Sequence, residues 1–267
     1  MLDLLNIYKN EDKFTKKKFG QHFLTSKQFI DMIAESLASA DCKQVVEIGP
    51  GCGVLTHAML EKGARVTAVE IDEDLVEFLP RYLFIYKGFE IIHSDFMKIR
   101  EEQLPEGKVA FAGNLPYNVS VEILMHCVNL FHKIEKMTFM FQKEVADRIN
   151  AKVSTKEYSS LSVICNYFFT MKKLKDISGG NFWPNTKVRS TVLEFYPKER
   201  YFEPEREKRF LDMVRKSFQM KRKTLHNNLK SYTGHEAAME RAGLAPNIRG
   251  EQMTTDDFIK LFEELDA

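Results

Sequence analysis

The sequence predicts an α/β fold followed by a small all-α domain. Between about residue 43 and residue 196, short apolar runs alternate with amphipathic stretches, a pattern typical of a parallel sheet covered by helices. Near Pro197–Pro204 this pattern ends, and beyond it we find only helical stretches, with Gly234 and Gly243 as natural helix ends. We therefore expect one domain over residues 1–198 and a helical domain over residues 199–267.

The strands and helices of both domains follow from these patterns. The apolar runs predicted to be strands are Gln44–Ile48, Arg65–Ile71, Glu90–His93, Val109–Ala112, Met137–Phe141, Leu161–Phe169 and Thr191–Tyr196. The helices expected between them are Val54–Glu61, Asp74–Tyr82, Val121–Phe131 and Lys143–Asn150, the second of them capped by Asp72. In the helical domain we expect helices at Glu205–Met220, Arg222–Tyr232, His235–Ala242 and Thr255–Leu265.

The composition is that of an ordinary globular protein, because 44% of the 267 residues are hydrophobic and 29% are charged. No apolar run is long enough to span a bilayer, and the N-terminal segment is too polar for a secretory signal and too acidic for a transit peptide. The four cysteines show no CxxC spacing, and the histidines form no metal-binding motif. We therefore expect a cytoplasmic monomer with free thiols, no metal and no membrane contact.

Positive charge is concentrated in two segments of the chain. The stretch from Arg206 to Lys230 holds nine Lys or Arg against two Asp or Glu, and residues 13–18 contain four lysines. Aromatic residues such as Phe14, Phe210 and Phe218 are interleaved with these charges. This combination favours a surface that follows a phosphate backbone, although such a run can also be a solvated helix face.

A glycine-rich loop follows the first predicted strand, with Gly49, Gly51 and Gly53 at alternate positions. Such a loop allows the backbone to turn tightly and to approach a ligand closely. About twenty residues later, Glu70 ends the next strand, where a carboxylate can accept both hydroxyls of an adenosine ribose. Asp95, after the third strand, is a candidate partner for the amino group of the adenine or else a helix cap.

The order of residues in this loop separates two kinds of cofactor. Glu47-x-Gly49-x-Gly51-x-Gly53 resembles motif I of the class I methyltransferases, whereas a dinucleotide-binding dehydrogenase normally has G-x-G-x-x-G. The resemblance implies a Rossmann-like methyltransferase domain with S-adenosyl-L-methionine as methyl donor. An acidic Glu47 suits a sulfonium better than it suits a pyrophosphate. A dehydrogenase loop and a purely structural glycine turn remain the alternatives.

The fourth predicted strand leads into Asn114-Leu115-Pro116-Tyr117. An adenine amino nitrogen is a poor nucleophile because its lone pair is delocalised into the ring. The side-chain oxygen of Asn114 and the backbone carbonyl of Leu115 can accept its hydrogens, and the ring of Tyr117 can stack on an extruded base. These residues are therefore our candidates for catalysis of methyl transfer to an adenine amino group.

This tetrapeptide resembles motif IV of the ribosomal RNA adenine N6,N6-dimethyltransferases, and the resemblance extends along the chain. Further stretches similar to signatures of that family are Phe19–Leu24, Gln142–Arg148, Phe182–Ser190 and Phe218–Leu225. Two positions depart from the family pattern, because His22 replaces an asparagine and Thr186 replaces a proline. The first departure weakens the assignment of a cofactor contact at residue 22, and the second implies a less rigid loop around Phe182.

The resemblance implies roles for individual residues. Phe182 is expected to form the second face of a clamp around the target base. The basic run, rather than the resemblance, leads us to expect that the helical domain contacts rRNA phosphates through Arg215, Lys221, Arg222 and Lys223. The cofactor contacts that it implies are His22, Leu24, Gly49, Gly51, Glu70, Asp95 and Asn114.

The family also implies a reaction and a partner. The expected reaction is dimethylation of two adjacent adenosines in the 3′-terminal hairpin of small-subunit, 16S-type rRNA, on the immature small ribosomal subunit. Two alternatives remain open at this point. One is a 23S rRNA adenine methyltransferase of the erythromycin-resistance type. The other is a relative that mainly binds, as an assembly or transcription factor.

Overall fold

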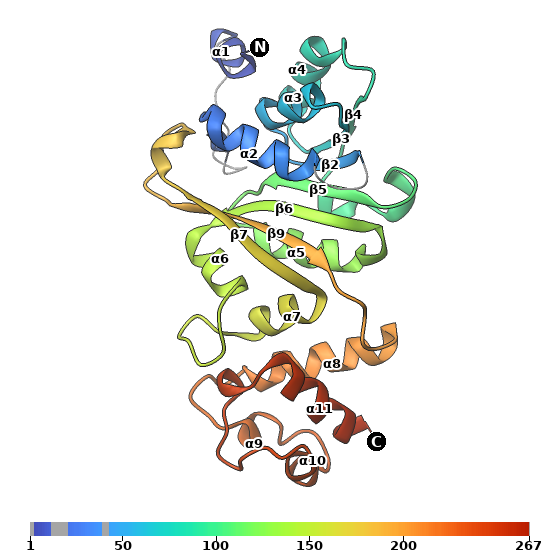
Figure 1. Cartoon of the computed structure of the whole chain (residues 1–267), viewed down its shortest axis with the longest axis vertical. Helices are drawn as coiled ribbons and strands as arrows, with labels where there is room; N and C mark the ends of the chain where they lie inside the picture. The colour runs from blue at the N-terminus through green and yellow to red at the C-terminus, as the bar shows by residue number, and fades with distance from the viewer. Residues whose placement is uncertain (1–2, 12–20, 39–42, 267) are drawn as a thin grey trace. The chain divides into compact units, whose positions relative to one another are not determined.

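The computed structural model describes residues 3–11, 21–38 and 43–266 (Figure 1). The lysine run at residues 13–18, the start of the Phe19–Leu24 stretch and Cys42 lie outside the described residues. The chain forms two compact units, one of Met1–Ala146 with Met171–Pro197 and one of Asp147–Thr170 with Lys198–Ala267. The predicted boundary at residue 198 therefore needs one correction, because residues 147–170 group with the C-terminal unit.

The first unit is built on a seven-stranded sheet with the strand order β4-β3-β2-β5-β6-β9-β7. Six of the seven predicted strands are confirmed, with their ends within three residues of the expected positions. The strands are β2 (Gln44–Ile48), β3 (Arg65–Glu70), β4 (Phe89–His93), β5 (Val109–Asn114), β6 (Ile134–Gln142), β7 (Phe169–Ile177) and β9 (Ser190–Pro197).

Strands β2 to β6 are parallel, and α-helices make three of the four connections between successive strands. These helices are α3 (Val54–Glu61), α4 (Glu73–Leu83) and α5 (Ser120–Asn129). The chain runs from β2 outwards to β4 and then returns to place β5 on the other side of β2. In such a sheet, a ligand crevice forms beyond the carboxyl ends of the two strands where the direction reverses, which here are β2 and β5.

The sheet is mixed rather than wholly parallel, which corrects the sequence-based expectation. Strand β9 runs antiparallel to β6, with Met137 opposite Phe195 and Gln142 opposite Ser190. An antiparallel edge on a mostly parallel sheet is common, because an antiparallel neighbour needs no crossover helix. The pairing brings Ser190 level with the end of β6, close to the crevice.

The N-terminal segment, for which the sequence predicted no element, contributes to the core of the first unit. Helices α1 (Leu4–Asn10) and α2 (Lys27–Ala38) contribute side chains to its hydrophobic cluster. Between them, β1 (Phe23–Leu24) pairs antiparallel with β8 (Phe182–Trp183), so that Leu24 lies opposite Phe182. This small second sheet joins segments 158 or more residues apart in the chain.

One predicted strand is wrong. The stretch Leu161–Phe169 forms helix α7 (Ser160–Phe168), and the strand that follows it is β7. Its side chains are almost all buried, and a continuous apolar run has the same appearance in a buried strand and in a buried helix. The distinguishing signal is local, since the Ser159 amide donates to the Ser162 hydroxyl (3.0 Å) and caps the helix.

The second unit is helical, as predicted, with one shorter helix than expected. Within Arg222–Tyr232, only α9 (Leu225–Asn228) is helical. The side-chain oxygen of Asn228 accepts from the Met220 amide (2.8 Å), and this bond holds residues 220–224 in a turn. The other helices are α6 (Lys143–Ile149), whose residues are divided between the two units, α8 (Pro204–Ser217), α10 (His235–Arg241) and α11 (Thr255–Asp266).

Short 3₁₀ helices occur in both units. The first unit contains η2 (Phe96–Lys98), η3 (Glu101–Gln103), η4 (Phe131–Lys133) and η5 (Gly179–Asn181), and the second contains η6 (Gly250–Gln252).

A buried ion pair connects three elements of the first unit. The Lys136 ammonium on β6 contacts the Glu194 carboxylate on β9 at 2.6 Å, and both side chains are at most 5% exposed. Ser36 at the end of α2 donates its hydroxyl to Glu194 (2.6 Å) and accepts from Lys136 through its carbonyl (2.8 Å). Burial acts to raise the pKa of Glu194, but the bonds from Lys136 and Ser36 outweigh it and hold that pKa below its usual value.

We predict that Lys136→Met lowers the free energy of unfolding by roughly 3–5 kcal/mol, because it leaves the buried Glu194 carboxylate with only the exposed Lys172, at 3.7 Å, as a cationic partner. The double variant Lys136→Met/Glu194→Leu should recover much of this loss, since it removes both charges. Urea unfolding of the wild type and the two variants measures the effect. A single variant as stable as the wild type would show that the pair does not hold the sheet to α2.

Candidate active site

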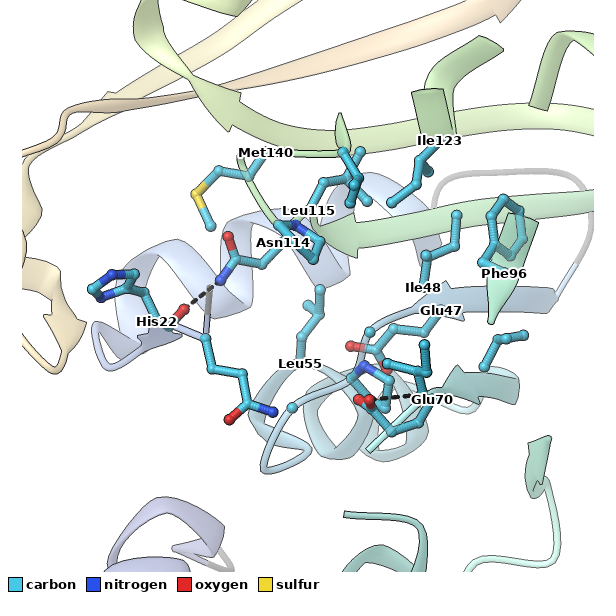
Figure 2. Close-up of a pocket in the computed structure, with 18 of the residues that line it drawn as sticks. His22, Glu47, Ile48, Leu55, Glu70, Phe96, Asn114, Leu115, Ile123 and Met140 are labelled. Carbon is cyan, nitrogen blue, oxygen red and sulfur yellow. Dashed lines mark hydrogen bonds between the residues drawn. The ribbon is translucent and has the colours of Figure 1, made fainter. Parts of the chain in front are cut away.

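A cavity of about 330 Å³ lies at the carboxyl ends of β2, β3 and β5 (Figure 2). Its size suits a small organic ligand or cofactor. Nine of the ten residues predicted for catalysis or cofactor contact line it, and Phe182 does not. These nine are His22, Leu24, Gly49, Gly51, Glu70, Asp95, Asn114, Leu115 and Tyr117.

The glycine loop forms the floor of the cavity after β2. Gly49 and Gly51 have φ values of +65° and +57°, a conformation that favours glycine. A Cβ on Gly51 would also lie 2.7 Å from the ring of Phe23. Both the backbone angle and the close approach of Phe23 therefore require glycine at position 51.

Glu70 ends β3 and turns its carboxylate towards the loop. Its Oε1 accepts hydrogen bonds from the backbone amides of Ile71 and Asp72, both at 2.8 Å, and the side chain is buried. Burial raises the pKa of Glu70, and the backbone bonds act in the opposite direction. Ile71 beside it is 46% exposed, and it gives the cavity an apolar rim next to a carboxylate that is fixed in orientation.

Glu47 behaves differently from a simple anion. It is buried inside the sheet and accepts the Thr56 hydroxyl at 2.5 Å. Burial raises the pKa of Glu47 to about 8, so the group is mostly protonated at neutral pH. The electrostatic attraction to a sulfonium that the sequence suggested for Glu47 is therefore weak in this structure.

Asp95 caps the short helix η2, because its Oδ1 accepts from the Met97 amide at 2.9 Å. The capping role and a place in the cavity wall are both observed, which leaves the expected contact with an adenine amino group as a prediction. Nearby, Gln21 donates its side-chain amide to Asp72 at 2.8 Å. This bond ties the N-terminal segment to the end of β3.

Asn114, the last residue of β5, is oriented by the backbone of the N-terminal segment. Its Nδ2 donates to the carbonyl oxygen of His22 at 2.7 Å, a bond drawn in Figure 2. Since the amide nitrogen is held by an acceptor, the other amide atom, Oδ1, is the one left to accept a hydrogen from a ligand.

The rings of Tyr117 and His22 are each held at one edge. The Tyr117 hydroxyl shares a hydrogen bond with the Ser190 hydroxyl (2.8 Å), and Nδ1 of His22 donates to the carbonyl of Pro184 (2.9 Å). Burial raises the pKa of Tyr117, so the phenol stays neutral. The two rings lie 19° from parallel, with 6.4 Å between their centroids.

Phe182 is not part of this cavity wall, which corrects its expected placement. It is 1% exposed and belongs to the hydrophobic core of the first unit, where β8 pairs with β1. Pairing with the buried Leu24 turns the ring inwards. Phe182 is therefore not among the residues that line the cavity with Tyr117, and its expected role in a base clamp stays a prediction.

The four basic residues predicted to contact RNA lie in the second unit. Arg215 lies in the last turn of α8, and Lys221, Arg222 and Lys223 follow that helix in the turn before α9; all four are exposed. Among the described residues none of them has an acidic side chain within 4.0 Å. The acidic residues of α11 have other partners, for example Glu264 with Arg241 and Asp266 with Arg206. The acidic C-terminal helix therefore pairs with Arg206 and Arg209 at the start of the basic run, but not with the four residues predicted to contact RNA.

One group of metal-binding side chains occurs in the described part of the chain, formed by His226, His235 and Glu236. Nδ1 of His235 donates to the carbonyl of Tyr232 (2.9 Å), which leaves its Nε2 to accept from Nδ1 of His226 (3.2 Å). The two rings thus satisfy each other by hydrogen bonding.

Sequence reasoning missed the groups that hold the site residues in place. Ser190 and Pro184 fix Tyr117 and His22, and the His22 carbonyl fixes Asn114. Ser190 and Pro184 fall within the Phe182–Ser190 signature, so their place in that signature was an available signal. Every residue has a backbone carbonyl, so no residue type indicates that the carbonyl of His22 accepts from Asn114.

None of the helices in the described ranges combines the length and the apolar composition needed to cross a membrane.

A profile of the family "Ribosomal RNA adenine dimethylase" matches residues 13–267. The chain is 38% identical over 265 residues to "Ribosomal RNA small subunit methyltransferase A" of Clostridium botulinum strain Okra, covering 96% of this chain and 95% of the relative. It is 36% identical to the protein of the same name from Hahella chejuensis, covering 92% and 91%.

Two solved structures share the fold over most of the chain. The 23S rRNA methyltransferase ErmE superposes with a TM-score of 0.73 at 26% identity, covering 92% of this chain and 100% of that one. A dimethyladenosine transferase from Plasmodium falciparum superposes with a TM-score of 0.78 at 22% identity, covering 92% and 98%. The match of the family profile, the identity to the two relatives and the shared fold agree with the arrangement around Glu70 and Asn114. The chain belongs to the ribosomal RNA adenine dimethylase family.

Proposed function

We propose that this protein transfers methyl groups from S-adenosyl-L-methionine to the exocyclic amino groups of two adjacent adenosines in the 3′-terminal hairpin of small-subunit rRNA. Its substrate is the immature small ribosomal subunit, and it acts as a cytoplasmic monomer in ribosome biogenesis. The observation that carries the proposal is the orientation of Asn114, whose Nδ2 is held by the His22 carbonyl and whose Oδ1 is left as an acceptor in the cavity that the glycine loop also lines. The names of the relatives support the substrate.

The residues at the β2 and β3 ends fit the methyl donor. The Glu70 carboxylate is fixed by two backbone amides and suits the paired hydroxyls of a ribose, and Ile71 offers an apolar surface for an adenine. The absence of side chains at Gly49 and Gly51 lets the backbone approach the rest of the molecule. When bound, S-adenosyl-L-methionine supplies an activated methyl group on a positively charged sulfonium.

The residues at the end of β5 serve the methyl acceptor. Asn114 Oδ1 accepts one hydrogen of the adenine amino group, and the Leu115 carbonyl accepts the other. These bonds localise the nitrogen lone pair, so that positioning and electrostatics replace an acid/base triad. Tyr117 stacks on the base, its ring held by Ser190. The proton released as the nitrogen is methylated passes to water.

Small-subunit rRNA is favoured over the alternatives by the length and identity of the matches. The relatives named for the small subunit share 38% identity over 96% of this chain, whereas ErmE shares 26%. A protein that only binds would not need the oriented acceptor at Asn114 or the fixed carboxylate of Glu70. The hydrogen bonds that orient Asn114 and Glu70 support a catalytic protein.

We predict that Glu70→Ala weakens binding of S-adenosyl-L-methionine by about 10-fold to 100-fold and leaves RNA binding unchanged. The variant loses charge-assisted hydrogen bonds to the ribose, worth roughly 1.5–3 kcal/mol. Calorimetric titration measures the affinity, with Glu77→Ala on the exposed face of α4 as control. Unchanged affinity in a folded Glu70→Ala protein would refute the ribose assignment.

We predict that Asn114→Ala lowers kcat for methyl transfer by about 100-fold or more, because the transition state loses a positioned acceptor. Association with the RNA should remain close to that of the wild type, since phosphate contacts lie elsewhere. A single-turnover assay with radiolabelled S-adenosyl-L-methionine measures the rate. Asn129→Ala, at the exposed end of α5, is the control. Dimethylation at the normal rate by the Asn114 variant would exclude the acceptor role.

We predict that replacing Lys221, Arg222 and Lys223 together with alanine weakens binding to the small subunit and lowers its salt slope by about three. Each lost phosphate contact reduces the slope by about one. Cofactor affinity should not change. A triple variant of the same charge at exposed lysines of the first unit, Lys43, Lys87 and Lys108, is the control. If the first triple variant keeps its salt slope and loses thermal stability instead, the run is structural.

A further inference from the structure

The imidazole of His22 has the geometry of a stacking surface rather than of a cofactor ligand. Nδ1 already donates to Pro184, and the carbonyl of His22 already accepts from Asn114. Figure 2 shows the ring at the end of the cavity away from Glu70, on the side of Asn114 and Met140. The ring therefore lies where the methyl acceptor is expected and not where the ribose is expected.

His22 and Tyr117 present nearly parallel rings in this part of the cavity. The interplanar angle is 19° and the centroids lie 6.4 Å apart. Stacked bases lie about 3.4 Å from one another, so a base between two rings needs about 6.8 Å from ring to ring. The perpendicular spacing of two near-parallel rings cannot exceed their centroid distance, so the two rings must separate by at least about 0.4 Å to admit a base.

The hydrogen bonds that hold the two rings leave their faces free. The bond to Pro184 uses a ring nitrogen of His22, and the bond to Ser190 uses the hydroxyl of Tyr117. Both atoms lie in the plane of their ring. Each ring is thereby fixed in orientation while a flat molecule can still contact its face. The residue that was expected to supply the second face, Phe182, is 1% exposed in the core.

We propose that His22 and Tyr117 together hold the target adenine, with the imidazole as the second stacking face in place of Phe182. This inference rests on the proposed function, because it takes the methyl acceptor to be an extruded adenine. His22 then has two separate roles. Its side chain stacks on the base, and its backbone carbonyl orients Asn114 towards the amino group of the same base.

The two roles can be separated, because substitution of the side chain keeps the backbone carbonyl. His22→Phe retains an aromatic face and loses the bond to Pro184. His22→Asn loses the aromatic face and retains a side-chain hydrogen-bond donor. A stacking role therefore requires the phenylalanine variant to work better than the asparagine variant, and a cofactor contact requires the reverse order.

The first measurement is a fluorescence titration of the full-length protein with 2-aminopurine riboside, whose emission is quenched when it stacks on an aromatic ring. We expect the wild type and His22→Phe to bind and quench it, and His22→Asn to bind about tenfold more weakly, the effect of one lost stacking face. His132→Asn, an exposed histidine outside the cavity, should match the wild type. Equal binding by the wild type and His22→Asn would overturn the proposal.

The second measurement is kcat/KM for methyl transfer to immature small subunits, with cofactor affinity determined in parallel. We expect His22→Asn to lose about tenfold in kcat/KM for RNA with unchanged cofactor affinity, and His22→Phe to stay near the wild type. A loss of cofactor affinity in both variants would overturn the proposal in favour of a cofactor contact. A wild type that quenches the riboside but methylates no small-subunit rRNA would refute the proposed function and leave the stacking role supported.

Discussion

The arrangement of the site depends on one hydrogen bond, from Asn114 Nδ2 to the carbonyl oxygen of His22. A side-chain amide has two chemically different ends, and this bond fixes the nitrogen end on His22, which leaves Oδ1 to accept from a ligand. The bond requires the N-terminal segment to lie across the end of β5. Pairing of β1 with β8, the core contacts of α1 and α2, and the Gln21–Asp72 bond hold that segment in place. Elements far from β5 in sequence thus determine the chemistry at its end.

The sheet separates the roles of two carboxyl groups that stand on neighbouring strands. Glu47 lies within β2, where burial raises its pKa to about 8 and leaves it mostly protonated. Glu70 ends β3, where two backbone amides hold the carboxylate in a fixed orientation. Both residues line the cavity, but Glu47 accepts from the Thr56 hydroxyl. The two carboxyl groups therefore differ because Glu70, at a strand end, has backbone amides as partners, whereas Glu47 lies inside the strand.

The sequence allowed prediction of the parallel strands and of the cavity wall, because both have periodic or short local signals. The glycine loop and the Asn114–Tyr117 stretch identify strand ends, and strand ends of a parallel sheet converge. Helix α7 was mistaken for a strand, since an apolar run buried on all sides has no period to distinguish the two. The burial of Phe182 could not be predicted for another reason. Its burial follows from the pairing of β8 with β1, a contact over 158 residues that no local pattern records.

The central claim is that this protein methylates adenosines of the small ribosomal subunit and that Asn114, at the end of β5, is the oriented hydrogen-bond acceptor. The most direct test is to incubate the protein and radiolabelled S-adenosyl-L-methionine with immature small subunits and, separately, with protein-free 23S rRNA. Mass spectrometry then maps the modified nucleotides. The account predicts N6,N6-dimethyladenosine at two adjacent positions of the small-subunit rRNA and none in the 23S rRNA. Methylation confined to 23S rRNA, or no methylation of either RNA, would contradict it.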